Sequence, residues 1–196
     1  MTKNNVDIEN DQRHAEALAR TGFWGVMAAG LLFLAKDTGR LGIAERSELV
    51  LEPLTYGTMG GAGNPGESPE EVAIREGGRE ETGYYGSIEM LPLAVFESQN
   101  GFKYFNFLGI VEKEFNPTLN WENRSFVWID SLDSLPAPLH PGMSYLLDKS
   151  KHIIETEMSK YLPHDSAYLA RARQAIDSIH QDEDLISKRQ AAKPRS

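Results

Sequence analysis

The segment GGAGNPGESPEEVAIREGGREETGY, residues 60–84, joins a glycine-rich stretch to an acidic helix pattern, and the interpretation of the whole chain starts from it. Ser68 is expected to cap the helix, Pro69 suits its first position, and Glu71 completes an S-x-x-E capping box. These signals predict a helix over residues 69–82 that stops at the following glycine, because glycine readily adopts the left-handed conformation that ends helices.

Charged helices are usually solvated surface elements, but this one follows a glycine-rich loop predicted over residues 60–66, a helix cap and an Arg-Glu pair at fixed distances. The segment resembles the Nudix box, whose pattern is GX5EX7REUXEEXGU with U an aliphatic residue. The residues that match this pattern are Gly61, Glu67, Arg75, Glu76, Glu80, Glu81 and Gly83. Two features depart from it: three residues instead of two separate the RE and EE pairs, and Tyr84 replaces the aliphatic residue.

The extra residue affects where the acidic side chains point. In a regular α-helix, Glu80 would lie about 40° around the axis from Glu76, whereas Glu81 would lie about 140° from it. A π-type turn absorbs one added residue, and the two glycines after Glu76 give the backbone the freedom to form it. We therefore predict a wide turn over residues 77–79 that returns the three carboxylates to one face.

The resemblance also implies a chemistry for these residues. A diphosphate carries concentrated negative charge, and clustered carboxylates can hold Mg²⁺ or Mn²⁺ between themselves and phosphate oxygens. By resemblance, the metal ligands would be the backbone carbonyl of Gly61 and the carboxylates of Glu76, Glu80 and Glu81. Arg75 would hold one of these carboxylates through a bidentate pair, a task that its planar guanidinium suits. Glu80 and Arg75 are accordingly assigned to catalysis as well.

Three residues outside the box have two interpretations each. Arg46, near the end of the second predicted strand, matches an arginine that contacts phosphate in family members, or it is a surface residue. Glu122 precedes the last predicted strand and matches a family glutamate that serves as a further metal ligand or general base, or it is a surface carboxylate. Trp121 either stacks on a base of the substrate or is a buried aromatic residue.

Hydrophobic patterns on both sides of the box predict a sheet flanked by helices. Strands are predicted over residues 28–36, 41–46, 55–59, 90–98, 102–112 and 124–130. Helices are predicted over residues 10–20, 142–160 and 165–180, the last of them followed by a polar tail. The 28–36 and 41–46 pair reads as a hairpin, and Asn100-Gly101 is a hairpin turn signal for the 90–98 and 102–112 pair. This order favours an α/β fold, a Nudix-type α/β/α sandwich with a mixed β-sheet.

The length of 196 residues suits one domain with extended ends. We expect an N-terminal helical extension over residues 1–22 and the Nudix domain over residues 23–160. The remainder, residues 161–196, is expected to form a C-terminal helix and a polar tail.

Composition and charge narrow the choice of partners. The net charge of −9 argues against stable nucleic-acid binding, which needs a dense Lys/Arg surface. The chain has no cysteine, and its five histidines lack zinc-ligand spacing, so we expect them to be surface or structural residues. The most apolar run, residues 23–35, is too short to span a membrane. We expect a cytoplasmic protein with a small nucleotide-derived substrate, and the sequence is compatible with a homodimer.

The function implied by the resemblance is Mg²⁺-dependent cleavage of a diphosphate bond in a nucleoside diphosphate-linked small molecule. Nucleoside triphosphates, ADP-ribose-like compounds and dinucleotides are the candidate substrates. Water would attack one phosphorus atom, with Glu122 as the candidate general base. The alternative is a catalytically impaired Nudix-fold module that binds nucleotides or regulates a partner. The inserted residue favours this alternative, whereas the retention of every acidic box residue disfavours it.

Overall fold

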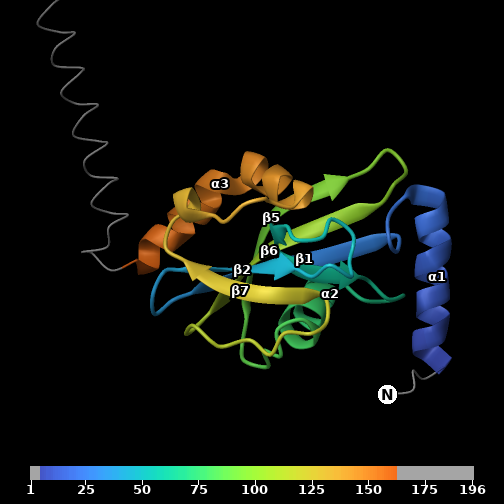
Figure 1. The fold of residues 1–196 in the computed structure, drawn as a ribbon, viewed down its shortest axis with the longest axis horizontal. Helices are drawn as coiled ribbons and strands as arrows, with labels where there is room; N and C mark the ends of the chain where they lie inside the picture. The colour runs from blue at the N-terminus through green and yellow to red at the C-terminus, as the bar shows by residue number, and fades with distance from the viewer. Residues whose placement is uncertain (1–4, 163–196) are drawn as a thin grey trace, which may run out of the picture.

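The structure, a computed structural model, describes residues 5–162 and contains one seven-stranded sheet (Figure 1). The strands are β1 (Met27–Ala35), β2 (Leu41–Arg46), β3 (Tyr56–Gly57), β4 (Met59–Ala62), β5 (Glu89–Glu97), β6 (Lys103–Val111) and β7 (Asn123–Ile129). The helices are α1 (Asn5–Thr21), α2 (Pro69–Ala73), the π-helix η1 (Ile74–Glu80), the 3-10 helix η2 (Leu132–Ser134) and α3 (Pro141–Tyr161). The helix and polar tail predicted after residue 164 lie outside the described residues.

The sheet is mixed, as predicted. Five of its strands follow the order β3-β2-β1-β6-β5, in which β1 and β6 run parallel and the other neighbours run antiparallel. The other edge of β1 is divided between two partners. Phe33 and Leu34 pair with β2, whereas residues 28–31 pair with β4. The divided edge places β4, which leads into α2, and β2, which ends at Arg46, on the same side of β1.

Alternate side chains of β1 face opposite layers, because successive residues of a strand point to opposite sides of the sheet. Leu32 and Leu34 pack in one core with Leu146 and other residues of α3. Leu31 and Phe33 belong to a second core that includes two residues of α2. Figure 1 shows α3 and α2 on opposite sides of the sheet. The predicted α/β/α sandwich is therefore confirmed.

Both predicted hairpins are present, and the third predicted strand differs from expectation. It is broken at Thr58 into β3 and β4, and β4 extends through Gly60 and Gly61 to Ala62. The prediction of a loop was therefore wrong for residues 60–62. These residues join the sheet because Gly60 approaches β1 so closely that a Cβ on it would overlap the carbonyl oxygen of Ala29. Residues 63–68 do form a loop.

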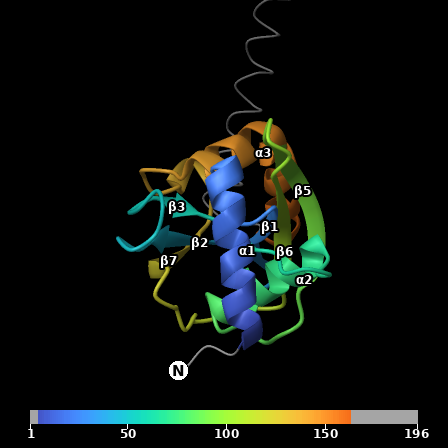
Figure 2. The same cartoon turned by 90° about the vertical axis from the view of Figure 1, so that its right-hand side faces the viewer.

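Helix α1 is present as predicted and begins earlier, at Asn5. Figure 2 shows it running across one end of the sheet. Its end is fixed by a hydrogen bond from Asn100 Nδ2 to the carbonyl oxygen of Thr21 at 3.2 Å. The following Phe23 stacks on Phe102 with 4.4 Å between ring centroids. Within residues 5–162, no helix combines the length and the apolar character needed to cross a membrane.

Candidate active site

The helix of the box begins as the sequence predicts. Ser68 Oγ accepts a hydrogen bond from the backbone N–H of Glu71 at 3.3 Å, and the Glu71 carboxylate accepts one from the Ser68 N–H at 2.8 Å. Both halves of the capping box are thus formed, with Pro69 in the first turn. Local side-chain chemistry fixes where this helix starts.

The second half of the box helix is a π-helix over Ile74–Glu80. The N–H of Glu81 donates to the carbonyl oxygen of Glu76 at 2.9 Å, a hydrogen bond between residues five positions apart. The predicted wide turn is confirmed and is longer than expected, since it occupies seven residues instead of three. The helical segment ends at Glu80, two residues before the predicted end at Thr82. The segment ends near Gly83, which has the left-handed φ of 65° that was predicted there.

Close packing of η1 against β4 depends on two glycines. A Cβ on Gly77 would lie 2.5 Å from the backbone carbonyl oxygen of Met59, which has no room to move. A Cβ on Gly61 would lie 2.6 Å from Cδ of Glu76. The Glu76 carboxylate therefore lies directly against the backbone of Gly61. The structure brings these two predicted metal ligands together.

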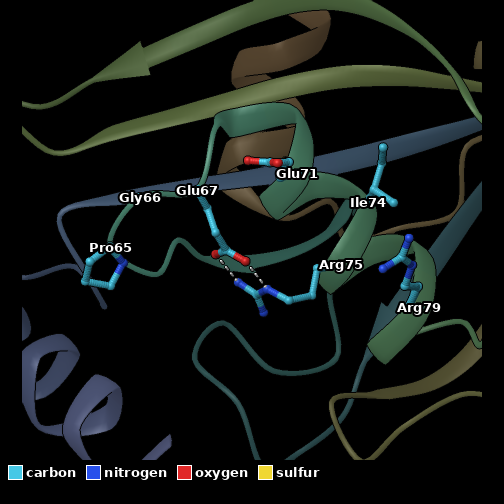
Figure 3. A pocket seen from close by; sticks show the side chains of 7 residues that line it. All are labelled: Pro65, Gly66, Glu67, Glu71, Ile74, Arg75 and Arg79. Atoms are coloured by element: carbon cyan, nitrogen blue, oxygen red, sulfur yellow. Dashed lines mark hydrogen bonds and ion pairs between the residues drawn. The ribbon is translucent and has the colours of Figure 1, made fainter. Parts of the chain in front are cut away.

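Arg75 connects the acidic residues of the box to the loop before it (Figure 3). Its bidentate pair is formed with Glu67, from Nε at 2.7 Å and Nη2 at 2.8 Å, and not with a predicted metal ligand. Its Nη1 reaches two predicted ligands, Glu76 at 2.7 Å and Glu80 at 3.1 Å. The expected bidentate partner was thus wrong, because Glu67 lies opposite the guanidinium and its second oxygen also accepts the N–H of Asn64 at 2.7 Å. Arg75 also lowers the pKa of Glu67.

The pair of Glu67 and Arg75 faces an open cavity of about 550 Å³ beside the box helix. Figure 3 shows the two side chains pointing toward each other, with Arg79 on the next turn. A second cavity of about 460 Å³ lies between α1 and the same loop and is lined in part by His14 and Glu67. His14 Nε2 lies 3.2 Å from the carbonyl oxygen of Gly63. Helix α1 therefore contacts the loop that carries the partner of Arg75.

Glu81 is the most deeply buried acidic residue of the site, with 3% of its surface exposed. One of its carboxylate oxygens, Oε2, accepts a hydrogen bond from Nδ2 of Asn123. The other, Oε1, is buried and has no hydrogen-bond partner among residues 5–162. Burial raises the pKa of Glu81 well above its usual value, and the negative charge of Glu122 adds to this effect. Such a group is costly in a folded protein unless a cation compensates it.

The other carboxylates of the site influence one another. Burial raises the pKa of Glu76 to about 7, against the opposing effect of Arg75, and Glu80 and Glu122 contribute in the same direction as burial. Burial also raises the pKa of Glu122, while Arg46 lowers it. Acidic groups from η1, from the residue after it and from the loop before β7 therefore lie within electrostatic reach of each other.

The predicted residues outside the box lie around this cluster. Arg46 ends β2, and its Nε donates to the carbonyl oxygen of Leu51 at 3.0 Å. Glu122 directly precedes β7, as expected, and its carbonyl oxygen accepts the N–H of Ser47 at 2.7 Å. Trp121 is 62% exposed, which excludes the interpretation as a buried aromatic residue. Arg46 and Glu122 are both partly buried, and the charge of Arg46 acts on the carboxylate of Glu122.

Two further residues lie at the site and were missed from the sequence. Asn123 holds Glu81, and its position next to Glu122 was the one available signal. Tyr104 on β6 has its pKa raised to about 12 by burial, with smaller effects from Thr58 and from charged residues of the site. Nothing in the sequence marked it. His140 was expected to be a surface or structural residue, and its Nδ1 does accept the N–H of Gly142 at the start of α3.

The donor set can be tested against a divalent metal ion. Carboxylate and backbone carbonyl oxygens are what Mg²⁺ prefers, and the partnerless buried oxygen of Glu81 is the kind of atom that a cation satisfies. The residues therefore fit such an ion in chemical type. Within residues 5–162, however, no three His, Asp or Glu side chains already converge as a metal-binding group. Arg75 instead bonds to Glu76 and Glu80.

Comparison with solved structures identifies the fold. A Nudix hydrolase from M. smegmatis, RenU, superimposes with a TM-score of 0.56 at 24% identity, covering 68% of this chain and 89% of that chain. The MutT protein from Methanosarcina mazei Go1 gives a TM-score of 0.50 at 21% identity, covering 68% of this chain and 92% of that chain. No protein-family model and no curated protein matches the sequence. The chain therefore has the Nudix fold.

Proposed function

We propose that this chain is a Mg²⁺-dependent hydrolase that cleaves a diphosphate bond in a nucleoside diphosphate-linked small molecule. Support comes from the Nudix fold together with the acidic residues at its box. Nucleoside triphosphates, ADP-ribose-like compounds and dinucleotides remain the candidate substrates. The net charge of −9 favours a small substrate over a nucleic acid.

The observation that carries the proposal is the buried Oε1 of Glu81, which has no hydrogen-bond partner in the part of the chain that the structure describes. Four carboxylates gather here, those of Glu76, Glu80, Glu81 and Glu122, and the guanidinium of Arg75 bonds to only two of them. Like charges in a partly buried cluster oppose folding unless something compensates them. A bound divalent cation would compensate such a cluster and would attract the oxygens of a phosphate chain.

We assign the metal ion to the carboxylates of Glu76, Glu80 and Glu81 and the backbone carbonyl of Gly61. When bound, Mg²⁺ would neutralise negative charge that develops on the phosphate chain. Arg75 holds Glu76 and Glu80 in place through its Nη1 while its other nitrogens remain bound to Glu67.

The remaining roles go to residues around the cluster. Glu122 would take a proton from the attacking water, a task for which its burial suits it, because burial raises the pKa of its carboxyl and so makes the carboxylate a stronger base. Arg46 would bind a phosphate oxygen with the guanidinium nitrogens that do not hold the loop at Leu51. The exposed indole of Trp121, next to Glu122, would stack on the base.

The test is a panel of nucleoside triphosphates, ADP-ribose, dinucleotides and capped RNA, each with Mg²⁺, with Mn²⁺ and with EDTA. We expect hydrolysis of at least one small nucleotide, products cut within the phosphate chain, and complete loss of activity with EDTA. No hydrolysis of any compound by folded protein, or release of only free base or sugar, would refute the proposal.

The second hypothesis, a catalytically impaired Nudix-fold module, is less well supported. It relied on the extra residue disturbing the acidic cluster. The π-helix accommodates that residue while Glu76, Glu80 and Glu81 remain close enough to influence one another, directly or through Arg75. A binding or regulatory module has no need of this cluster, which costs stability.

A further inference from the structure

The hydroxyl group of Tyr104 lies at the centre of the sheet, in a space that two glycines leave open. Gly30 of β1 and Gly60 of β4 are paired directly across the ladder. A Cβ on Gly30 would overlap the Tyr104 hydroxyl oxygen, and a Cβ on Gly60 would lie 2.8 Å from it. Any larger residue at either position would therefore displace the hydroxyl group. None of the roles proposed above uses it.

The hydroxyl group of Tyr104 makes little use of its ability to form hydrogen bonds. Among residues 5–162, its one recorded partner is Oγ1 of Thr58, at 3.5 Å. O–H···O hydrogen bonds in proteins usually measure about 2.5–3.0 Å, so this contact is a weak one. The hydroxyl group of Tyr145, by contrast, donates to the carbonyl oxygen of Val95 at 3.0 Å, an ordinary hydrogen-bond length. Tyr104 therefore has a proton available for a ligand.

The surrounding charges indicate which ligand would take that proton. Glu81 and Glu76, both assigned to the metal, and Arg46, assigned to phosphate, all act electrostatically on the Tyr104 hydroxyl. A phosphate chain bound to a metal ion on the two carboxylates and to the guanidinium of Arg46 would therefore lie within electrostatic reach of this hydroxyl. Phosphate oxygens are strong acceptors, and a phenol with an ordinary pKa of about 10 remains a donor at neutral pH.

We propose that Tyr104 is a substrate-positioning residue that donates its hydroxyl proton to a non-bridging oxygen of the substrate's phosphate chain. This inference rests on the proposed function, because it assumes that a phosphate chain binds at the carboxylate cluster. The proposal adds a contact from β6 to those already assigned. Arg46 and Gly61 belong to β2 and β4, which pair with one edge of β1, whereas β6 pairs with the other edge. The phosphate chain is then held by a cation, a guanidinium and a neutral donor.

The experiment compares Tyr104→Phe with Tyr145→Phe, which removes a hydroxyl group that makes a shorter hydrogen bond on α3, away from the cluster. Binding of imidodiphosphate with Mg²⁺ is measured by calorimetry, and unfolding in urea is measured for each variant. Imidodiphosphate has no nucleoside and resists hydrolysis, so the measurement does not depend on turnover. We expect Tyr104→Phe to weaken binding by roughly 10-fold or more, as for a lost hydrogen bond to a charged group. Its stability should stay near that of the parent chain, and Tyr145→Phe should bind normally.

Two kinds of result in these measurements would overturn the inference. Unchanged binding by Tyr104→Phe would show that the hydroxyl contacts no phosphate, and so would a failure of the parent protein to bind the probe. A Tyr104→Phe chain that unfolds, or that loses stability equally with Thr58→Val, would assign the hydroxyl group to the fold. The outcome of the nucleotide panel is independent of the binding measurement. Weakened probe binding without hydrolysis of any nucleotide would keep this inference and refute the proposed function, whereas hydrolysis with unchanged binding would do the reverse.

Discussion

Helix α2 and the π-helix η1 follow each other without a break, yet different forces determine them. Helix α2 starts at a complete capping box and buries the side chains of Val72 and Ala73 against the sheet. The residues that η1 buries are Gly77 and Gly78, so that its backbone itself packs on β4. Local chemistry thus sets the first segment, whereas a close approach between two backbones sets the second. The acidic residues of the box that are assigned to the metal lie in η1 or directly after it.

The largest expected contrast between the two segments concerns their acidic residues. Glu81→Gln, just after η1, should reduce metal-dependent hydrolysis by about 100-fold or more. A loss of this size exceeds the usual effect of removing a group that only hydrogen-bonds to a metal ligand. Without metal, the same change should leave the protein equally or more stable, because it removes a buried charge that lacks a partner on Oε1. Glu71→Gln in α2 is the matched control, since Gln serves equally in a capping box. Equal losses of rate in both variants would contradict the contrast.

The two buried glycines of η1 should differ in their tolerance of alanine. A Cβ on Gly77 would lie 2.5 Å from the backbone of Met59, whereas the nearest atom to a Cβ on Gly78 would be the end of the Ile88 side chain, at 3.3 Å. We expect Gly77→Ala to lower the free energy of unfolding in urea by about 1–3 kcal/mol, as overpacking does. Gly78→Ala should change it by less than about 1 kcal/mol, since alanine favours helices. A Gly77→Ala protein as stable as the parent would show that backbone packing does not determine η1.

The start of α2 should affect stability alone. Ser68→Ala removes the side-chain acceptor of the N-cap and should cost about 1 kcal/mol in the free energy of unfolding. Because η1 is held by β4, kcat should remain at the parent value under conditions where both proteins are folded. Unfolding in urea and steady-state kinetics measure the two quantities separately. A fall in kcat at unchanged stability would mean that the cap positions the acidic residues.

The smallest expected change comes from shortening η1 itself. Deleting Gly78 leaves two residues between the RE and EE pairs and allows regular i to i+4 hydrogen bonding. If the π-helix merely accommodates an additional residue, metal-dependent turnover of the deletion variant should equal or exceed that of the parent. Initial rates are compared once thermal unfolding shows that the variant is folded. A folded variant without activity would show that the π register is itself required.

The sequence allowed prediction of those parts of the fold that depend on near neighbours. The capping box at Ser68, the hairpin turn at Gly101 and the helix ending near Gly83 each follow from residues within a few positions. The π-helix was also predictable, because the spacing of Glu76 and Glu81 required it. The parts of the fold that the sequence could not reveal depend on pairing between distant segments. Residues 60–62 became a strand only because β1 offered them an open edge.

The same distinction holds for the candidate site. The box carboxylates and Glu122 were identified from spacing and resemblance, and the structure places them within electrostatic reach of one another. The bidentate partner of Arg75 was misassigned, because the position of Glu67 depends on how the loop before α2 folds back. Tyr104 was missed, because its approach to the site requires β6 to lie parallel to β1. The roles of all these residues in binding and hydrolysis remain predictions.

The parallel pairing of β1 with β6 also has a consequence for how the protein folds. In the hairpins β1–β2 and β5–β6, the paired strands follow each other in the sequence. In the pairing of β1 with β6, all the strands from β2 to β5 lie between the two partners in the sequence. Loop closure of that kind is slow compared with hairpin formation. Asn123, which holds Glu81, leaves the ribosome after both hairpins and the box helix. The carboxylate cluster therefore reaches its final arrangement late, after synthesis has passed β6 and reached β7, and no shorter nascent chain has the complete site.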